Sequence, residues 1–197
     1  MDKDFVTSDD FVKLLEEPQE QLSLVIKSHY EIDTLLDRLL TVSISNVDSL
    51  EMRRISFILK VDILISLGVI RPDFKKLFNN INMIRNIYAH NPYSIFDSKQ
   101  AEKSKTILMQ IDESRSLVKE FTEPTDILVF VFLNAYIFLE TALKNQYRKI
   151  QGGVVLNKRI HKVLGTSTPR VSEASIQSYH AEIESNLQEM FPKLFGK

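Results

Sequence analysis

The sequence predicts an all-α protein, an antiparallel helical bundle in which residues 1–197 form a single helical domain. Three observations support this prediction. Apolar residues recur at the i, i+3 and i+4 spacing of a buried helical face along almost the whole chain. Glycine and proline are scarce, at five and six residues, which argues against a turn-rich β sandwich. The connections between the predicted helices are short, which favours antiparallel neighbours.

The first two helices are predicted at residues 8–17 and 19–41, with a polar loop at 43–48. Pro18 separates the two helices, because proline disrupts the hydrogen bonds of a helix interior. One face of the second helix is apolar at helical spacing and is expected to be buried. This face contains Leu22, Val25 or Ile26, His29, Ile32, Leu35 or Leu36, and Leu39.

The next two helices have clear end signals. Asp48 or Ser49 is expected to cap a very apolar helix that ends before Gly68, a residue suited to the left-handed conformation. Pro72 opens the fourth helix, where its missing N–H costs nothing. The fourth helix ends before Pro92, since the residue before a proline disfavours the α region. Its inner face is expected to comprise Phe74, Leu77, Phe78, Ile81, Ile84 and Tyr88.

The rest of the chain is expected to form three helices, at residues 98–121, 125–150 and 171–191. Asp97 or Ser98 caps the first of them, and the pair Gly152-Gly153 is expected to end the second. Residues 154–165 have no clear preference, and a loop is expected at 166–170.

The composition excludes several classes of protein. Hydrophobic residues make up 44% and charged residues 26%, which is ordinary for a globular protein and unlike a disordered chain. Twenty-five Lys and Arg against 26 Asp and Glu give a formal net charge of −1, which excludes nucleic-acid binding by bulk basicity. The chain has no cysteine and only four histidines, so we expect no disulfide, no metal site and no cofactor.

A cytoplasmic protein without a membrane segment is expected. The first four residues, MDKD, lack the apolar region of a signal peptide. The most apolar run, at residues 127–139, is shorter than the roughly 20 residues that span a bilayer. This run is therefore expected to be a buried core helix.

A polar cluster at the end of the fourth helix has groups suited to catalysis. Arg85 and His90 are five residues apart, about 140° around a regular helix, and Pro92 is expected to fray the helix end at His90. Asn86 shares a face with His90 and can hydrogen-bond its imidazole. Arginine can bind a phosphate, and histidine can act as general acid or base near neutral pH. Metal-independent RNA cleavage by the 2′-hydroxyl needs these groups.

The same residues have a simpler interpretation. A basic residue and a histidine near a helix C-terminus favour the helix macrodipole and can cap free carbonyl groups. Residue spacing leaves both interpretations open. The chain contains none of the motifs G-x-x-x-x-G-K-[ST], G-x-G-x-x-G, G-x-S-x-G and H-E-x-x-H.

The stretches FILK at residues 57–60, LGVI at 67–70, RN at 85–86 and AHN at 89–91 resemble the HEPN superfamily of helical bundles. The resemblance is to its mannitol-operon-repressor-like and toxin-like branches. It covers a core at about 20–122 and leaves a C-terminal helical extension at about 123–197. It implies a homodimer with a metal-independent ribonuclease site between the protomers. It also implies a toxin or defence effector that an antitoxin or regulatory partner silences.

Carried over by position, the resemblance assigns Arg85 to the phosphate, Asn86 to the adjacent polar position and His90 to general acid–base catalysis. Asn91 and Tyr93 are supporting residues. Tyr93 stands one position later than the tyrosine of many HEPN toxins, because Pro92 occupies that place. The mannitol-operon-repressor-like branch implies instead a non-catalytic regulatory or protein-interaction module.

Other charged residues have two interpretations each. His29 is expected to be a satisfied, partly buried histidine rather than a second catalytic group, and Glu31 can meet Arg85 across the bundle. Lys60 and Asp62 interrupt an apolar helix and are expected to be paired. A basic run late in the chain is either an RNA-tracking surface or a solvated face. Its residues are Lys144, Arg148, Lys149, Lys158, Arg159, His161, Lys162 and Arg170.

Overall fold

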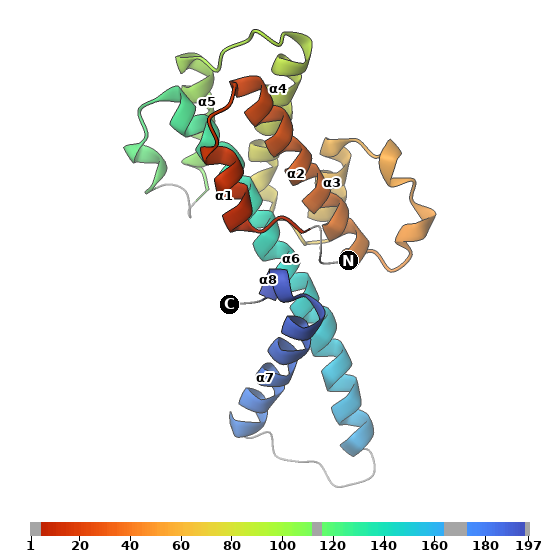
Figure 1. Ribbon diagram of the computed structural model, residues 1–197. Coiled ribbons are helices and arrows are strands. Elements are labelled where there is room, and N and C mark those ends of the chain that lie inside the picture. The colour runs from red at the N-terminus through yellow and green to blue at the C-terminus, as the bar shows by residue number, and fades with distance from the viewer. Residues whose placement is uncertain (1–4, 112–115, 164–172, 196–197) are drawn as a thin grey trace. The chain divides into compact units, whose positions relative to one another are not determined.

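The computed structural model describes residues 5–111, 116–163 and 173–195, which contain eight α-helices and no strand (Figure 1). This part of the chain is all-α, as the apolar periodicity predicts. The helices are α1 (Ser8–Glu16), α2 (Gln21–Ser43), α3 (Phe57–Ser66), α4 (Lys75–His90), α5 (Ser98–Leu108), α6 (Pro124–Val163), α7 (Glu173–Met190) and α8 (Pro192–Phe195). Short 3₁₀ turns lie at Val47–Ser49, Met52–Arg54, Pro72–Phe74 and Val118–Glu120.

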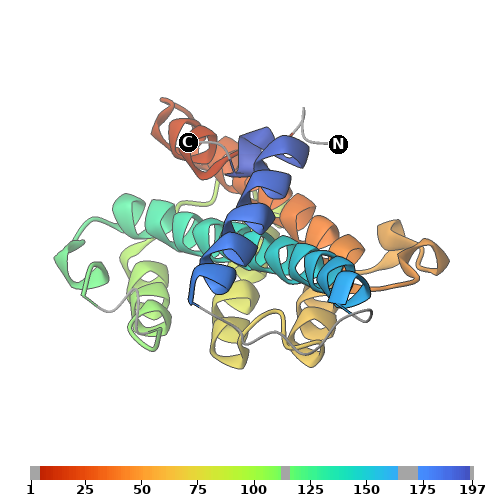
Figure 2. The same cartoon turned by 90° about the horizontal axis from the view of Figure 1, so that it is seen from below.

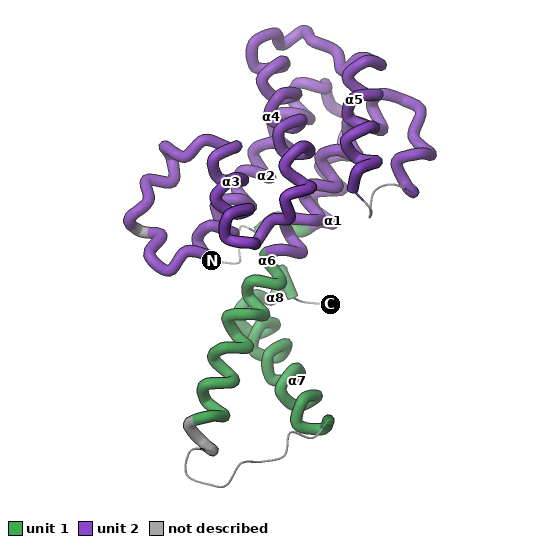
Figure 3. The backbone as a smooth tube through the Cα atoms, turned by 180° about the vertical axis from the view of Figure 1, so that it is seen from behind, with its two compact units in different colours: residues 1–7, 143–197 green, residues 8–142 purple. Residues whose placement is uncertain are grey.

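The chain divides into two compact units, which Figure 3 shows in different colours. Unit 2 comprises residues 8–142, and unit 1 comprises residues 1–7 and 143–197. The first half of α6 belongs to unit 2 and its second half to unit 1. This division falls later than the boundary expected near residue 122 between core and extension.

The core of unit 2 forms around α2, which packs against α1, α3 and α4. Its predicted apolar face is buried at Val25, Ile32, Leu35, Leu36 and Leu39. Ile26 is exposed, so Val25 is the core residue of that pair. Aromatic pairs join the first half of α6 to this core. Phe11 stacks on Tyr136 with ring centroids 4.0 Å apart, and Phe74 stacks on Phe138 at 3.6 Å.

The directions of α2, α3 and α4 follow from their contacts. α2 and α4 run antiparallel, because the Tyr88 hydroxyl near the end of α4 donates to Gln21 at the start of α2, at 2.8 Å. α2 and α3 run in the same direction. His29 lies against Phe57, and Lys60 reaches carboxylates one and two turns further along α2. The connection after α2 contains the two 3₁₀ turns at Val47–Ser49 and Met52–Arg54 and carries the chain back before α3 begins. The antiparallel arrangement expected of sequential helices was therefore wrong for α2 and α3, because this connection is long enough to return.

α3 ends as predicted but begins later. Gly68 follows it with a positive φ of 68°, the conformation for which glycine is suited. Asp48 and Ser49 do not cap the helix, because they lie in a 3₁₀ turn. Ser56 is the cap, and its hydroxyl accepts from the Leu59 N–H at 3.4 Å. The expected start of this helix was therefore wrong, because the earlier residues form a separate 3₁₀ turn at Val47–Ser49.

α5 begins at the predicted cap but ends early. The Asp97 carboxylate accepts from the Gln100 N–H at 2.8 Å, and the Gln100 side chain accepts from the Asp97 N–H at 3.1 Å. The helix ends at Leu108 instead of continuing to about Phe121. The later apolar residues form a separate 3₁₀ turn in which Val118 is buried. The residues predicted to form one helix at 98–121 therefore contain two separate elements, α5 and the 3₁₀ turn at Val118–Glu120.

Gly152 and Gly153 do not end α6, which continues to residue 163. Contacts with α7 offset the cost of glycine, about 1 kcal/mol for each residue in a helix interior. The Tyr179 hydroxyl donates to the Gly152 carbonyl at 2.8 Å, and Arg148 pairs with Glu184 at 2.8 Å. Within unit 1, α7 therefore runs back along α6 in the opposite direction (Figures 1 and 2).

α6 has the length and composition of a membrane-spanning helix. An 18-residue window within it has a mean hydropathy of 1.8, and 56% of that window is buried inside the protein. A core helix of a soluble protein has the same properties. The expectation of a cytoplasmic protein without a membrane segment stays a prediction.

Candidate active site at the end of α4

α4 has one buried face and one exposed face. The six residues predicted for its inner side and the preceding turn are all buried: Phe74, Leu77, Phe78, Ile81, Ile84 and Tyr88. On the other side Arg85 and His90 are exposed and Asn86 is half-buried. The two side chains predicted to bind phosphate and transfer protons, Arg85 and His90, therefore reach solvent at the C-terminal end of α4.

The Arg85 guanidinium has an amide partner but no carboxylate partner among the described residues. Its Nη1 donates to Asn86 Oδ1 at 3.2 Å. Four other arginines are neutralised, since Arg54, Arg71, Arg148 and Arg159 each pair with a carboxylate at 2.6 to 3.1 Å. The charge of Arg85 therefore remains available for an anion.

Arg85 and His90 do not come together within one chain. α4 is regular to its last residue, and the Asn91 N–H bonds to the Ile87 carbonyl at 2.9 Å. The expectation of a frayed end at His90 was wrong, because the disruption before Pro92 begins only at Asn91, whose backbone is extended. Arg85 and His90 thus stay about 140° apart around the helix.

The expected hydrogen bond from Asn86 to His90 is not formed in the described part of the chain. Asn86 instead accepts from Arg85. The amide orients the guanidinium, and the imidazole at the helix end is left exposed.

The two supporting residues after the helix form a turn. The Asn91 side chain accepts from the Tyr93 N–H at 3.2 Å, and the Asn91 carbonyl accepts from the Ser94 N–H at 3.0 Å. This arrangement holds Tyr93 outward, with 92% of its surface exposed. Asn91 therefore shapes the loop, and the Tyr93 ring is free for contact with another molecule.

Glu31 does not contact Arg85. It lies in a cleft of about 550 Å³ between α1 and α2, beside Leu14, Ile26 and Tyr30. Burial raises the pKa of Glu31, and the nearby Arg38 opposes that change. The expected cross-bundle contact was wrong, because Glu31 follows His29 by two positions and faces the other side of α2.

His29 is the α2 residue that faces Arg85. It is partly buried, as expected, with its ring 4.4 Å from Phe57, but it is not fully satisfied, because its buried Nε2 has no hydrogen-bond partner among the described residues. Burial, together with a smaller effect of the Arg85 charge, lowers the pKa of His29 to about 4, and Asp33 opposes the change. A neutral imidazole therefore lies beside the Arg85 charge at neutral pH. His29 could be predicted to lie on the inner face of α2, but its proximity to Arg85 could not.

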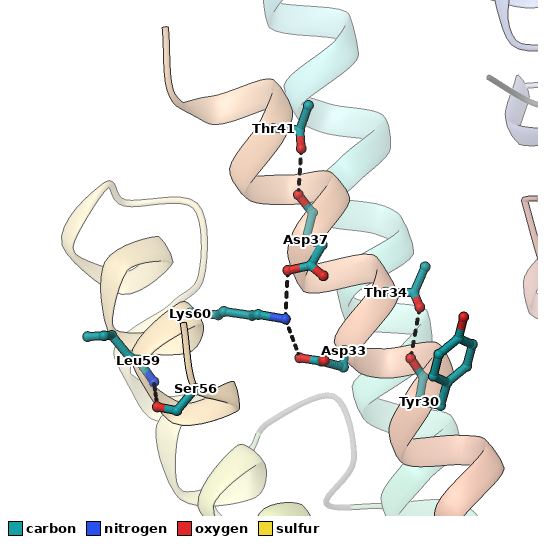
Figure 4. A network of polar contacts seen from close by, with 8 residues as sticks. All are labelled: Tyr30, Asp33, Thr34, Asp37, Thr41, Ser56, Leu59 and Lys60. Carbon is teal, nitrogen blue, oxygen red and sulfur yellow. Dashed lines mark hydrogen bonds and ion pairs between the residues drawn. The ribbon is translucent and has the colours of Figure 1, made fainter. Parts of the chain in front are cut away.

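Lys60 is paired, as expected, but not with Asp62. Its Nζ lies 2.7 Å from one carboxylate oxygen of Asp33 and 2.7 Å from one of Asp37, both on α2 (Figure 4). Only 4% of the Lys60 side chain is exposed. Asp62 pairs with Lys75 on α4 at 2.7 Å. The spacing of Asp33 and Asp37, four residues apart on one helix face, is the sequence signal that could have identified the partners.

The basic run late in the chain partly stabilises unit 1. Arg159 lies over the Tyr179 ring at 5.4 Å and pairs with Glu182, and Arg148 is bound to Glu184. Lys149 and Lys158 are exposed, and Lys144 is half-buried. The side chains of His161 and Lys162, and all of Arg170, lie outside the described residues. Two residues of this basic run, Arg148 and Arg159, are therefore committed to the packing of α7 on α6.

In the part of the chain that the structure describes, no group of three or more His, Cys, Asp or Glu side chains could hold a metal ion. No family model matches the chain, and neither the curated proteins nor the solved structures contain a match. The HEPN-type relationship therefore rests on the resemblance alone.

Proposed function

We propose that the protein is a metal-independent endoribonuclease of HEPN type, in which Arg85 binds the scissile phosphate and His90 transfers protons. The uncommitted Arg85 charge supports this most directly. Arg85 is exposed, is oriented by Asn86, and has no carboxylate partner within the described residues. An arginine held in this way suits a phosphate whose negative charge increases in the transition state.

A second copy of the chain completes the site. One copy holds Arg85 and His90 about 140° apart on α4 and offers one arginine and one histidine to a phosphate. In a two-fold homodimer formed through this end of α4, the contacts are reciprocal, and Arg85 of each copy can face His90 of the other. Two histidines then supply the base that removes the 2′-hydroxyl proton as its oxygen attacks the phosphorus, and the acid that protonates the leaving 5′-oxygen. Single-stranded RNA fits best, because its 2′-hydroxyl can rotate in line with the phosphate.

The cleavage test uses purified wild type with total RNA in the presence of EDTA. Wild type is expected to cleave, and Arg85→Ala and His90→Ala are each expected to reduce the rate about 100-fold or more. Asn86→Ala should reduce it less, because the amide only orients the guanidinium. Retained cleavage in either Ala variant, or intact RNA with wild type, would contradict the proposal.

Two control variants match the substituted residues. Arg53 is an exposed arginine that no described carboxylate pairs with, and His180 is an exposed histidine on α7. Arg53→Ala and His180→Ala should cleave like wild type. Circular dichroism of all variants shows whether a loss of cleavage reflects chemistry or unfolding.

The second candidate is a non-catalytic regulatory module that binds a protein partner through the same surface. Tyr93 and Ile95 are 92% and 73% exposed just after α4, and apolar side chains in this position suit protein contact. Intact RNA with wild type, together with an antitoxin-like or regulatory partner whose binding is lost in Tyr93→Ala, would favour this candidate.

A further inference from the structure

The second half of α6 has an exposed apolar face within unit 1. On its opposite face, Gly152 and Arg159 lie against Tyr179 of α7, and Val155 is buried. On the exposed side four large apolar side chains are 42% to 49% exposed: Ile150, Val154, Leu156 and Ile160. Positions 146, 150, 153, 157 and 160 alternate by four and three residues, the spacing of a helix–helix seam. We call these positions, with Lys149, Val154 and Leu156 beside them, the α6 seam.

Gly153 at the centre of the α6 seam has no close neighbour among the described residues that would require a glycine. A Cβ on Gly152 would lie 2.9 Å from the Tyr179 hydroxyl, so packing on α7 requires that glycine. A Cβ on Gly153 would have nothing within 4 Å, and its φ is not positive. Neither backbone geometry nor a neighbouring atom of the same chain explains a residue that weakens the helix. Close approach of a second backbone does explain it.

We propose that the α6 seam binds the same seam of a second copy, with two antiparallel α6 helices crossing at Gly153. A two-fold axis at Gly153 places residue 153+n of one copy opposite residue 153−n of the other. Ile150 then faces Leu156, and Ile160 faces Gln146. Lys149 faces Asn157, so no like charges meet along the seam. The surface is complementary to itself, which favours a second copy over an unrelated partner.

The size of the α6 seam sets the strength of this dimer. The seam covers about four helical turns, or roughly 20 Å. Such a contact buries less surface than the roughly 1,200–2,000 Å² that is typical of stable interfaces. The dimer is therefore reversible and depends on protein concentration. It lies in unit 1, whereas Arg85 and His90 lie in unit 2, so it goes beyond the proposed ribonuclease site.

Sedimentation equilibrium over a wide concentration range tests the dimer. Wild type is expected to associate reversibly as its concentration rises, and Leu156→Glu to lose the part of this association that the α6 seam provides, because each new carboxylate would face Ile150. Leu59→Glu is the matched control, because Leu59 on α3 and Leu156 are both 49% exposed. It should dimerise like wild type. Circular dichroism confirms that both variants fold.

An introduced cysteine tests the crossing point. The chain has no cysteine, so Gly153→Cys under mild oxidation can form a disulfide only between two copies at this position. Helices that cross at residue 153 bring the two Cα atoms within disulfide reach. Ser185→Cys, at an exposed position on α7, should stay uncoupled.

A wild type that stays monomeric at all concentrations would overturn the proposal. So would an association that is unchanged in Leu156→Glu, together with no disulfide in Gly153→Cys, because all of the association would then use another surface, such as the one at Arg85 and His90. Binding of a monomer to phosphatidylcholine–phosphatidylserine vesicles, lost in Leu156→Glu, would also overturn it and assign the seam to a lipid surface. RNA cleavage is measured separately, so failure of the ribonuclease proposal leaves this test unaffected.

Discussion

The ammonium group of Lys60 is almost fully buried within unit 2. Its carboxylate partners, Asp33 and Asp37, are 34% and 41% exposed, so the charges meet at the edge of the core. The pair of carboxylates compensates the desolvation of the ammonium, which neither could do as well alone. This network joins α2 to α3 at a position that hydrophobic contacts alone do not specify.

Removing the carboxylates should cost more than removing the ammonium. The double variant Asp33→Asn/Asp37→Asn is expected to lower the free energy of unfolding by about 3 kcal/mol, because it leaves a buried charge unpaired. Lys60→Met should cost less, since an apolar side chain of similar length replaces the charge. Urea denaturation measures both. Asp62→Asn, which breaks the exposed pair with Lys75, is the control, with an expected loss below about 1 kcal/mol.

His29 should make stability depend on pH. Its pKa is lowered from 6.5 to about 4 by burial, so between these values the unfolded state binds more protons than the folded state. The free energy of unfolding is therefore expected to be highest above pH 6.5 and to fall as pH decreases toward 4. Urea denaturation across this range should show a slope of about 1 kcal/mol per pH unit that His29→Gln removes.

A matched substitution at the exposed His180 tests this assignment. His180→Gln should leave the pH dependence close to that of wild type. Parallel curves for wild type and His29→Gln would show that the imidazole is not the responsible group.

At the scale of elements, neighbouring glycines in α6 have different roles. Gly152 faces α7 and gives space to the Tyr179 hydroxyl, which donates to its carbonyl. Gly153 is exposed, and a Cβ at its position would meet no atom of the described residues within 4 Å. The sequence pattern predicts that α6 ends at this pair, whereas packing on α7 keeps the helix continuous through it.

Alanine substitutions should separate the two glycines. Gly153→Ala is expected to raise the free energy of unfolding of the monomer by about 0.5–1 kcal/mol, because alanine favours the helix and meets no neighbour. Gly152→Ala should lower it, because the new methyl group displaces the Tyr179 hydroxyl. Thermal and urea denaturation at low protein concentration measure both, and equal effects would contradict the assignment.

The helix ends show which sequence signals are sufficient. Asp97, Gly68 and Pro92 mark their boundaries as expected, because each acts through its own backbone or its nearest neighbours. The signals at Asp48 and at Gly152-Gly153 predict wrong helix boundaries. Asp48 lies in a 3₁₀ turn before the helix, and contacts with α7 keep α6 helical through the two glycines.

At the scale of the whole molecule, charge limits how RNA can bind. The net charge of −1 provides no general attraction for a polyanion. Four arginines of the described residues are neutralised by carboxylates within their own unit: Arg54 and Arg71 in unit 2, and Arg148 and Arg159 in unit 1. Affinity for RNA in the proposed ribonuclease therefore comes from Arg85 of both copies, and specificity comes from the geometry that dimerisation creates.

The sequence by itself determined the all-α class, the buried face of α4 and the exposed cluster of Arg85, Asn86 and His90 at its end. These features depend on apolar periodicity and on end signals that act over one or two turns. They could be predicted because local propensity and burial agree there.

Only the tertiary structure decided which side chains meet. It placed His29 rather than Glu31 beside Arg85, paired Lys60 with Asp33 and Asp37, and kept α6 helical through its glycines. Such pairings depend on the rotation and direction of helices far apart in sequence, which periodicity along one helix does not specify.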